Sequence, residues 1–532
     1  MSTQDATLQA LTTDAGPVSP GFSPGRRSYA LRVPHRVGTL RVTAQGRDAR
    51  ALLRLEAPGT TVEAALLSST GVPGAPVATY GPPSTADPAL VRPAEPGLTA
   101  EGVAAGRPLA GGVPCEPIPL DPGRNLLRIG VTAADGTTQE RYELKVIRGH
   151  PAPDWVQVTP AAPWRPRDSA GELVFAGRMW LFGGYLPELV SDVWSSADGA
   201  TWTPHAPIPA RAGINIPVNW VHEGRMWVAS NDGQLFSSAD GTEWTLENED
   251  PPWKGRYAAG GVSFAGRMWV LGGKGPRGLH ADVWSSADGR EWNLELASAP
   301  WSPRQVFSML AVHDGQLWVV GGGISVYHPF RAYTDVWRSP DGRAWTQVVE
   351  EAPWPARIWS TAVSYGGRLW VLGGFRAEPT WNNFADVWYS ADGAAWHRLE
   401  TETCWSPRHE LSAYVFDDAL WVAGGNAWPL QQDVWRLQIP GLCFLTQPVV
   451  EEFATARYTY RARADFSASG LPVRYRLVEG PGWLSLDADT GLLSGVPQSV
   501  GDVPLTLEAR DEAGESARQS WVLHVIPVSG GT

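Results

Sequence analysis

The text FAGRMWLFGG (residues 175–184), followed by DVWSSADGATW (192–202), decides the fold of this chain. Six versions of it occur along the sequence. Their central tryptophans, spaced 42 to 52 residues apart, are Trp180, Trp227, Trp269, Trp318, Trp370 and Trp421. A period of this size with strand-like text in each copy is typical of a radial β-propeller. We therefore expect an all-β protein with a six-bladed propeller at residues 154–440.

Each copy predicts four strands, a to d. Strand a follows a Pro-Trp-x-x-Arg element, b ends at a Gly-Gly doublet, c carries Asp-Val-Trp, and d begins at the tryptophan after Asp-Gly. The d-strand tryptophans number only five: Trp202, Trp244, Trp292, Trp345 and Trp396. The sixth copy ends at residues 435–437 without one. We expect residues 155–159 to supply that strand by pairing beside 433–438, which closes the ring and leaves no long unpaired edge.

The glycine doublets, the spaced aromatic residue and the closing tryptophan resemble the kelch repeat over residues 155–438. This resemblance implies the fold and says little about function. The second copy departs from it, with Ala229-Ser230 and Leu235-Phe236 in place of the doublet and of Val-Trp. The text SADGATW (196–202) is also similar to the Asp-box hairpin of sialidases. Both resemblances predict a structural c–d hairpin, in which the aspartate accepts hydrogen bonds from backbone amides.

Tryptophan usage separates three parts, because 26 of the 28 tryptophans lie between residues 155 and 435. Residues 1–150 read as short strands at 28–33, 39–44, 125–133 and 140–147, which predicts an antiparallel sandwich. Both ends of this part resemble the bacterial cadherin-like β-sandwich domain, and the Pro/Gly-rich residues 57–114 predict a long inserted loop. Residues 445–528 look like the Ig-fold domain of bacterial multidomain surface proteins. Both flanking parts resemble spacers.

Composition narrows the classes of function. The net charge of −12 argues against nucleic acid as a partner, because phosphate binding needs a basic face. The sequence has no apolar run long enough to span a membrane, and its first residues lack the features of a secretory signal. Three cysteines and ten histidines without metal-binding spacing predict neither a metal site nor a cofactor. The domain types suggest the cell surface or secretion, whereas the first residues do not resemble a signal peptide, so the sequence leaves localisation open. It also leaves the oligomeric state open.

Five Trp-x-x-Arg elements, and Pro207-x-x-x-Arg211 in the second copy, place one arginine before each innermost strand: Arg167, Arg211, Arg256, Arg304, Arg357 and Arg408. Together they predict a cationic mouth suited to carboxylates. The alternative is that each arginine joins neighbouring blades through carbonyls or an adjacent acid, since repeated residues usually serve the repeat. The positions one or two residues after them are not repeated and are candidates for function: Asp168, Tyr257, Gln305, Trp359, His409 and Glu410.

Long b–c loops in the fourth and fifth copies, residues 324–334 and 375–385, are the second candidate surface. The predicted ligand contacts in them are Tyr327, His328, Arg331, Arg376, Trp381 and Asn382. Aromatic and arginine-rich loops on a rigid scaffold are typical of binding surfaces. Packing of these loops on one another is the alternative. If strands run as in kelch propellers, the d–a and b–c loops share one face.

We therefore predict a binding protein that recognises a glycan or an acidic peptide on this loop face. The first alternative is an enzyme acting on a sugar acid, similar to sialidases or to sialic-acid epimerases. Its catalytic candidates are Glu410, Asp168 and His409, although the sequence does not give the separation of the two carboxylates. No nucleophile elbow or phosphate loop supports catalysis. The second alternative is a spacer in a surface or appendage assembly.

Overall fold

The structure, a computed structural model, describes residues 3–33, 37–56, 106–120, 123–148, 151–326, 329–377 and 380–527. These residues form strands and turns without a helix, which confirms the all-β class. No candidate membrane-spanning helix occurs within these ranges. By its internal contacts the chain divides into two units, Pro153–Gln438 and a second unit of Met1–Ala152 with Ile439–Thr532.

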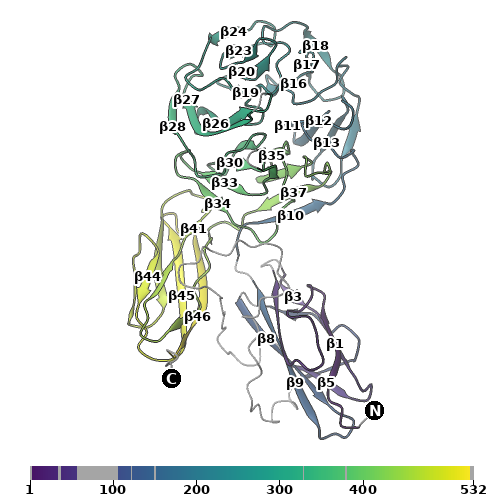
Figure 1. The fold of residues 1–532 in the computed structure, drawn as a ribbon, viewed down its shortest axis with the longest axis vertical. Coiled ribbons are helices and arrows are strands. Elements are labelled where there is room, and N and C mark those ends of the chain that lie inside the picture. Colours follow the sequence, from purple (N-terminus) through teal and green to yellow (C-terminus); the bar gives the residue numbers. More distant parts are fainter. Residues whose placement is uncertain are drawn as a thin grey trace. The chain divides into compact units, whose positions relative to one another are not determined.

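The first unit is a ring of six four-stranded antiparallel sheets, the blades (Figure 1). Its innermost strands, a, contact one another in cyclic order. They are β11 (Gly171–Phe175), β15 (Asn219–His222), β19 (Gly260–Phe264), β25 (Leu310–His313), β29 (Thr361–Tyr365) and β35 (Ser412–Phe416). The b strands are β12 (Arg178–Phe182), β16 (Arg225–Ala229), β20 (Arg267–Leu271), β26 (Gln316–Ile324), β30 (Arg368–Leu372) and β36 (Ala419–Ala423).

The outer half of each blade consists of strands c and d. The c strands are β13 (Val193–Ser196), β17 (Leu235–Ser238), β23 (Val283–Ser286), β27 (Arg331–Ser339), β33 (Val387–Ser390) and β37 (Val434–Gln438). The d strands are β14 (Thr203–His205), β18 (Thr245–Asn248), β24 (Asn293–Leu296), β28 (Thr346–Val349), β34 (His397–Leu399) and β10 (Asp154–Thr159). Small hairpins lie in two b–c loops: β21 (Lys274–Gly275) with β22 (Gly278–Leu279), and β31 (Phe375–Arg376) with β32 (Asn382–Asn383). The blades are numbered 1 to 6 from β11 onward.

The ring closes through β10, which is the outermost strand of blade 6. It pairs antiparallel with β37, so that Trp155 lies opposite Leu437 and Gln157 opposite Trp435. Trp155 is fully buried in this joint. The closure predicted from the missing sixth tryptophan is therefore confirmed.

The b-strand tryptophans and the c–d hairpins fit each other between neighbouring blades. Trp180 of blade 1 is buried and donates its indole N–H to the Phe175 carbonyl at 3.0 Å. Gly241, in the hairpin of blade 2, lies so close to this ring that an added Cβ would be 2.1 Å from it. The other four such pairs are Gly199 with Trp421, Gly289 with Trp227, Gly342 with Trp269 and Gly393 with Trp318. The repeated Asp-Gly thus belongs to the joint between blades.

The hairpins have the structural role predicted for them. In blade 1, Asp198 Oδ1 accepts hydrogen bonds from the amides of Ala200 (2.9 Å) and Thr201 (2.7 Å). Ser196 Oγ accepts one from the Gly199 amide at 2.8 Å. These bonds hold the turn and leave the aspartate no catalytic partner within it.

The N-terminal part of the second unit has one hydrophobic core between its sheets. A five-stranded sheet has the order β2 (Ser28–Val33), β9 (Gln139–Arg148), β8 (Gly123–Thr132), β5 (Leu52–Glu56), β6 (Arg107–Leu109). The shorter pairs are β1 (Leu8–Thr13) with β4 (Val42–Gly46) and β3 (Thr39–Leu40) with β7 (Ile118–Pro119). The predicted strands 28–33, 125–133 and 140–147 are present, whereas 39–44 is divided into β3 and β4, which lie in different sheets. β2 runs parallel to β9, contrary to the antiparallel expectation. Residues 57–105 of the predicted insertion lie outside the described residues, and Arg107–Leu109 continues the sheet.

The C-terminal part has its own core, which includes Tyr458, Leu493, Leu507 and Trp521. A four-stranded sheet has the order β39 (Glu451–Phe453), β46 (Ser516–Ile526), β45 (Gly501–Asp511), β42 (Val473–Glu479). A second sheet has the order β40 (Tyr458–Arg461), β44 (Leu492–Gly495), β43 (Leu484–Leu486), and β38 (Cys443–Phe444) pairs with β41 (Ala464–Asp465). Two sheets over one core agree with the predicted sandwich.

Candidate functional site

The d–a and b–c loops lie on one face of the propeller, as predicted. In five blades the residue after the conserved arginine forms a β-bridge with a residue at or just beyond the end of the glycine doublet. The bridges are Asp168–Tyr185, Tyr257–Lys274, Gln305–Gly323, Ile358–Phe375 and His409–Asn426. These bridges fix the non-repeated positions relative to the b–c loops, and we call this side the loop face.

Five of the six arginines are buried in ion pairs. The guanidinium of Arg357 donates to both oxygens of Asp386, at 2.5 and 2.9 Å, and to the Gly373 carbonyl at 2.9 Å. Asp386 begins the Asp-Val-Trp text, and it also accepts the indole N–H of Trp388 at 2.8 Å. The same pairing joins Arg167 to Asp192, Arg256 to Asp282, Arg304 to Asp335 and Arg408 to Asp433. These are the structural contacts that the sequence left as the alternative.

The paired aspartates leave these arginines little charge to offer a ligand. Burial disfavours ionisation of Asp386, but the hydrogen bonds and charge of Arg357 outweigh it and hold the pKa of the carboxyl below its ordinary value. Arg211 differs, since its side chain is 76% exposed and lies 3.6 Å from the exposed Glu249. Its expected equivalence to the other five is wrong, because blade 2 has Gln234 where the others have the aspartate. Ligand binding by the arginines stays a prediction without a contact to support it.

The d–a loops end in a ring of left-handed residues around the propeller axis. This central ring consists of Ser169, Ile216, Ala258, Ser308, Trp359 and Glu410, with φ between 48° and 57°. Backbone hydrogen bonds link it between blades: the Ser169 amide donates to the Glu410 carbonyl (3.2 Å), and the Glu410 amide to the Trp359 carbonyl (3.0 Å). Each non-glycine residue in the left-handed conformation costs on the order of 1 kcal/mol of folding free energy. Because every blade has one, the strain belongs to the repeat, and only the side chains distinguish the blades.

Blades 1 and 6 bring three predicted catalytic candidates together in a carboxylate–histidine cluster of Asp168, His409 and Glu410. One side-chain ligand atom from each lies within 4.8 Å of those of the other two. All three residues are buried, with exposures of 4%, 3% and 9%. His409 Nε2 is 3.7 Å from Glu410 Oε2. The separation that the sequence left open is therefore short.

Side chains around the cluster orient its members. Asp168 accepts hydrogen bonds from Ser169 Oγ on Oδ1 and from Asn426 Nδ2 on Oδ2, both at 2.9 Å. Asn383 Oδ1 lies 2.7 Å from His409 Nδ1. The imidazole also stacks on Trp359, with ring centroids 5.2 Å apart. Asp168 and His409 are thus held in place before any ligand binds.

Burial governs the protonation of the cluster. It raises the pKa of Asp168 to about 6 and lowers the pKa of His409 to about 4. Burial and the charge of Asp168 raise the pKa of Glu410 well above its ordinary value. Burial, with the charges of Glu410 and Asp168, also raises the pKa of Tyr257, which is 38% exposed beside them.

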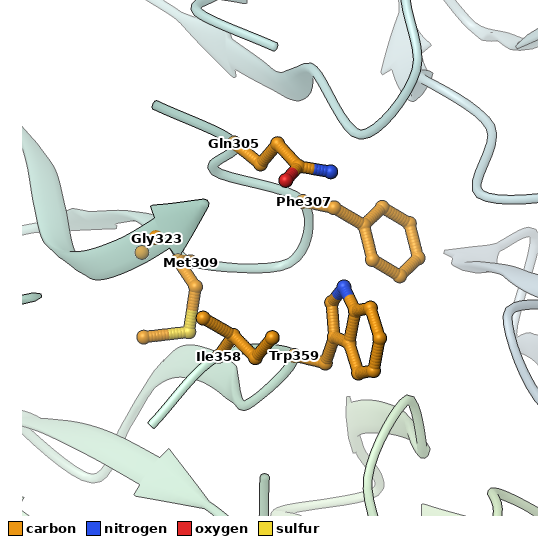
Figure 2. A pocket seen from close by; sticks show the side chains of 7 residues that line it. Gln305, Phe307, Met309, Gly323, Ile358 and Trp359 are labelled. Atoms are coloured by element: carbon orange, nitrogen blue, oxygen red, sulfur yellow. The ribbon is translucent and has the colours of Figure 1, made fainter. Parts of the chain in front are cut away.

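The opposite side of the central ring is apolar. Ile216, Ala258 and Phe307 form one buried cluster. A small pocket between blades 4 and 5 is lined by Gln305, Phe307, Met309, Gly322, Gly323, Ile358 and Trp359 (Figure 2). The centre of the loop face thus has a polar side, at blades 1 and 6, and an apolar side.

Beside the cluster lies an aromatic patch of Phe375, Trp381 and Trp428. Trp381 and Trp428 are 71% and 51% exposed and stack with ring centroids 6.1 Å apart. Buried Phe375 meets both edge-on, at 5.6 and 5.5 Å. The four exposed aromatic side chains of the described propeller residues all lie in loops of this face: Tyr185, Tyr257, Trp381 and Trp428. Exposed apolar groups gathered on one face mark interaction sites.

The remaining predicted contacts are less informative. Asn382 is exposed next to Trp381, and Arg376 is half-buried with its guanidinium 5.7 Å from the Phe384 ring. Arg331 is exposed in β27, because the fourth b–c loop continues the β26–β27 ladder as far as Ile324 opposite Arg331. Tyr327 and His328 lie outside the described residues.

Sequence reasoning missed several residues that shape this site. Trp428 and Asn426 lie in the short b–c loop of blade 6, whereas only the long loops were considered. Phe375 began a considered loop without an assigned role. An aromatic residue shortly after a glycine doublet, as in GGNAW (424–428), is the signal that was available.

Comparison with known families gives two matches. Residues 167–447 match the model described as DUF6242 beta propeller domain, and residues 445–526 match the one described as Putative Ig domain. Neither is a kelch repeat or a cadherin-like domain, so those two resemblances stay predictions. Comparison with curated proteins gives no match. A propeller with an Ig-like domain fits an interaction or binding protein in general.

Proposed function

This chain belongs to the DUF6242 beta propeller domain family, and on that premise we propose that it binds an uncharged glycan on the loop face. The aromatic patch carries the proposal. The C–H face of a pyranose ring is apolar and packs on an indole, and stacked Trp381 and Trp428 offer such a surface to solvent. Leaving two tryptophans exposed keeps apolar area in water, which binding would cover.

The polar groups beside the patch fit the hydroxyl groups of a sugar. Asn382 is exposed next to Trp381, and Tyr257 reaches the surface next to the cluster. A few polar groups at the edge of an apolar contact area are typical of small-molecule sites. Rigid aromatic side chains also lose little conformational entropy on binding.

An acidic peptide or a sugar acid is the less favoured ligand. The arginines expected to hold its carboxylate are paired with aspartates inside the blades. The carboxyl groups of Asp168 and Glu410 lie at the centre of the loop face instead. In the metal-free chain, the carboxylate of Asp168 would repel an anionic ligand placed there.

Glycan-array screening of the full chain tests the proposal. We expect binding to neutral oligosaccharides that falls at least tenfold in Trp428→Ala and in Trp381→Ala. Leu246→Ala removes an exposed apolar side chain from β18, outside the loop face, and is the matched control that keeps binding. Equal binding by all three variants would refute the patch as the site.

A second candidate function is hydrolysis of a glycosidic bond. It is favoured by one observation, the approach of Asp168 and Glu410 oxygens to within 4.8 Å, near the separation of about 5 to 5.5 Å in retaining glycosidases. Release of the aglycone from aryl glycosides measures it. Turnover that disappears in Glu410→Gln supports it, and the absence of turnover by the wild-type chain on a panel of glycosides rejects it.

A further inference from the structure

Two buried carboxyl groups lie in the carboxylate–histidine cluster without a cation beside them. Among the described residues no lysine or arginine forms an ion pair with Asp168 or Glu410. Ser169 has a single hydroxyl proton and donates it to Asp168. Burying carboxylates without a counter-charge is costly, so such a group binds either a proton or a metal cation.

The hydrogen-bond network fixes the tautomer of His409. Asn383 Nδ2 donates to the Asn426 carbonyl at 2.8 Å, so Asn383 Oδ1 is the acceptor that faces His409 Nδ1 at 2.7 Å. The imidazole proton is therefore on Nδ1, and Nε2 carries the lone pair. Nε2 has no hydrogen-bond donor among the described residues, although the residue is 97% buried, and it faces Glu410 Oε2 at 3.7 Å.

Two electron-pair donors that face each other in a buried site repel unless a proton or a metal cation lies between them. The arrangement of His409 is the one found in metal sites, where the ligating imidazole donates its other N–H to a neighbouring oxygen. The position of the proton on His409 is an observation separate from the two carboxyl groups, since it follows from the hydrogen bonds of the Asn383 side chain to His409 and to the Asn426 carbonyl. The aromatic stacking of His409 on Trp359 holds the lone pair in this direction.

We propose that Asp168, His409 Nε2 and Glu410 bind one divalent transition-metal ion at the centre of the loop face. Ligands about 2.0 to 2.2 Å from a zinc ion are about 3 to 3.5 Å from one another, so the present separations need only a modest contraction. One nitrogen and two carboxylate donors suit Zn²⁺ or Mn²⁺, whereas Ca²⁺ takes six to eight oxygens. Three protein ligands leave coordination positions open. This site goes beyond glycan binding and does not rest on it.

Calorimetric titration of the chelator-treated, dialysed full chain with Zn²⁺ or Mn²⁺ alone tests the site. We expect one ion per chain, with affinity lowered at least tenfold in Glu410→Gln and in His409→Gln. Asn383→Ala, which frees His409 Nδ1, should lower the affinity about 10- to 100-fold. Glu172→Gln changes a carboxyl group of β11 outside the cluster and should bind like the wild type.

Thermal unfolding in EDTA separates lost binding from misfolding. Glu410→Gln should unfold at the wild-type temperature or above it, because it removes a buried acid without a counter-charge. The proposal is overturned if the wild-type chain binds neither ion at one per chain. It is also overturned if the cluster variants bind as tightly as the wild type, or if Glu172→Gln loses binding equally. Glycan binding measured in EDTA stays a separate result.

Discussion

Replacing Gly241 with alanine tests how the blades are joined. The added Cβ would lie 2.1 Å from two ring atoms of Trp180, whereas carbon atoms in contact need about 3.5 to 4.0 Å. Trp180 is 2% exposed and has no room to move without disturbing Phe182 and Met226 in the same core. Overpacking of this kind costs about 1 to 3 kcal/mol, and alanine at φ +77° costs about 1 kcal/mol more.

Gly224→Ala is the matched control. Gly224 has φ +69° in an a–b turn, and an added Cβ meets nothing within 4 Å. It should lose only the backbone cost of about 1 kcal/mol. Urea unfolding followed by tryptophan fluorescence reports on the propeller, since 26 of the 28 tryptophans lie between residues 155 and 435. Equal losses in the two variants would refute the joint between Gly241 and Trp180.

The buried ion pairs make two further predictions. Arg357→Ala should lose about 3 to 5 kcal/mol of unfolding free energy, because Asp386 is left buried and unpaired. Arg211→Ala should change the unfolding free energy by less than about 0.5 kcal/mol. Urea unfolding of both variants measures these changes, and an Arg357→Ala variant as stable as the wild type contradicts the prediction. Asp282 and Asp386 have pKa values below the ordinary one, because the hydrogen bonds and charges of their arginines outweigh burial. The stability that these ion pairs give the folded protein is therefore present above about pH 4 and is lost as the pH falls through the lowered pKa values. Stability that does not decline between pH 5 and pH 2 in urea titrations would count against these pairs.

The repeat predicted most of the propeller because local and global signals agree in it. The missing sixth tryptophan located the closing strand, since a ring leaves no other partner for β37. The role of the arginines was harder to predict, because the sequence around an arginine that is free to bind a ligand does not differ from that around an arginine in an ion pair. One signal was available: blade 2 lacks both Trp-x-x-Arg and the aspartate of Asp-Val-Trp. The joint loss of both elements in one blade indicates that the arginine and the aspartate are partners.

The candidate site depended on contacts that no spacing reveals. Asp168 and Glu410 were both named from their positions after the arginines, but only the closure of blade 6 on blade 1 brings them together. The aromatic patch likewise joins Trp381 and Trp428 from two blades. The parallel pairing of β2 with β9 was missed because alternation of side chains predicts a strand and not its direction.

Calorimetry with a matched pair of oligosaccharides, one neutral and one carrying a carboxylate, tests the central claim most directly. In EDTA, the full chain should bind the neutral member more tightly, and the Trp381→Ala/Trp428→Ala double variant should lose at least tenfold in affinity for it. Tighter binding of the carboxylated member, unchanged in the double variant, would contradict the account and indicate that the arginines bind the ligand.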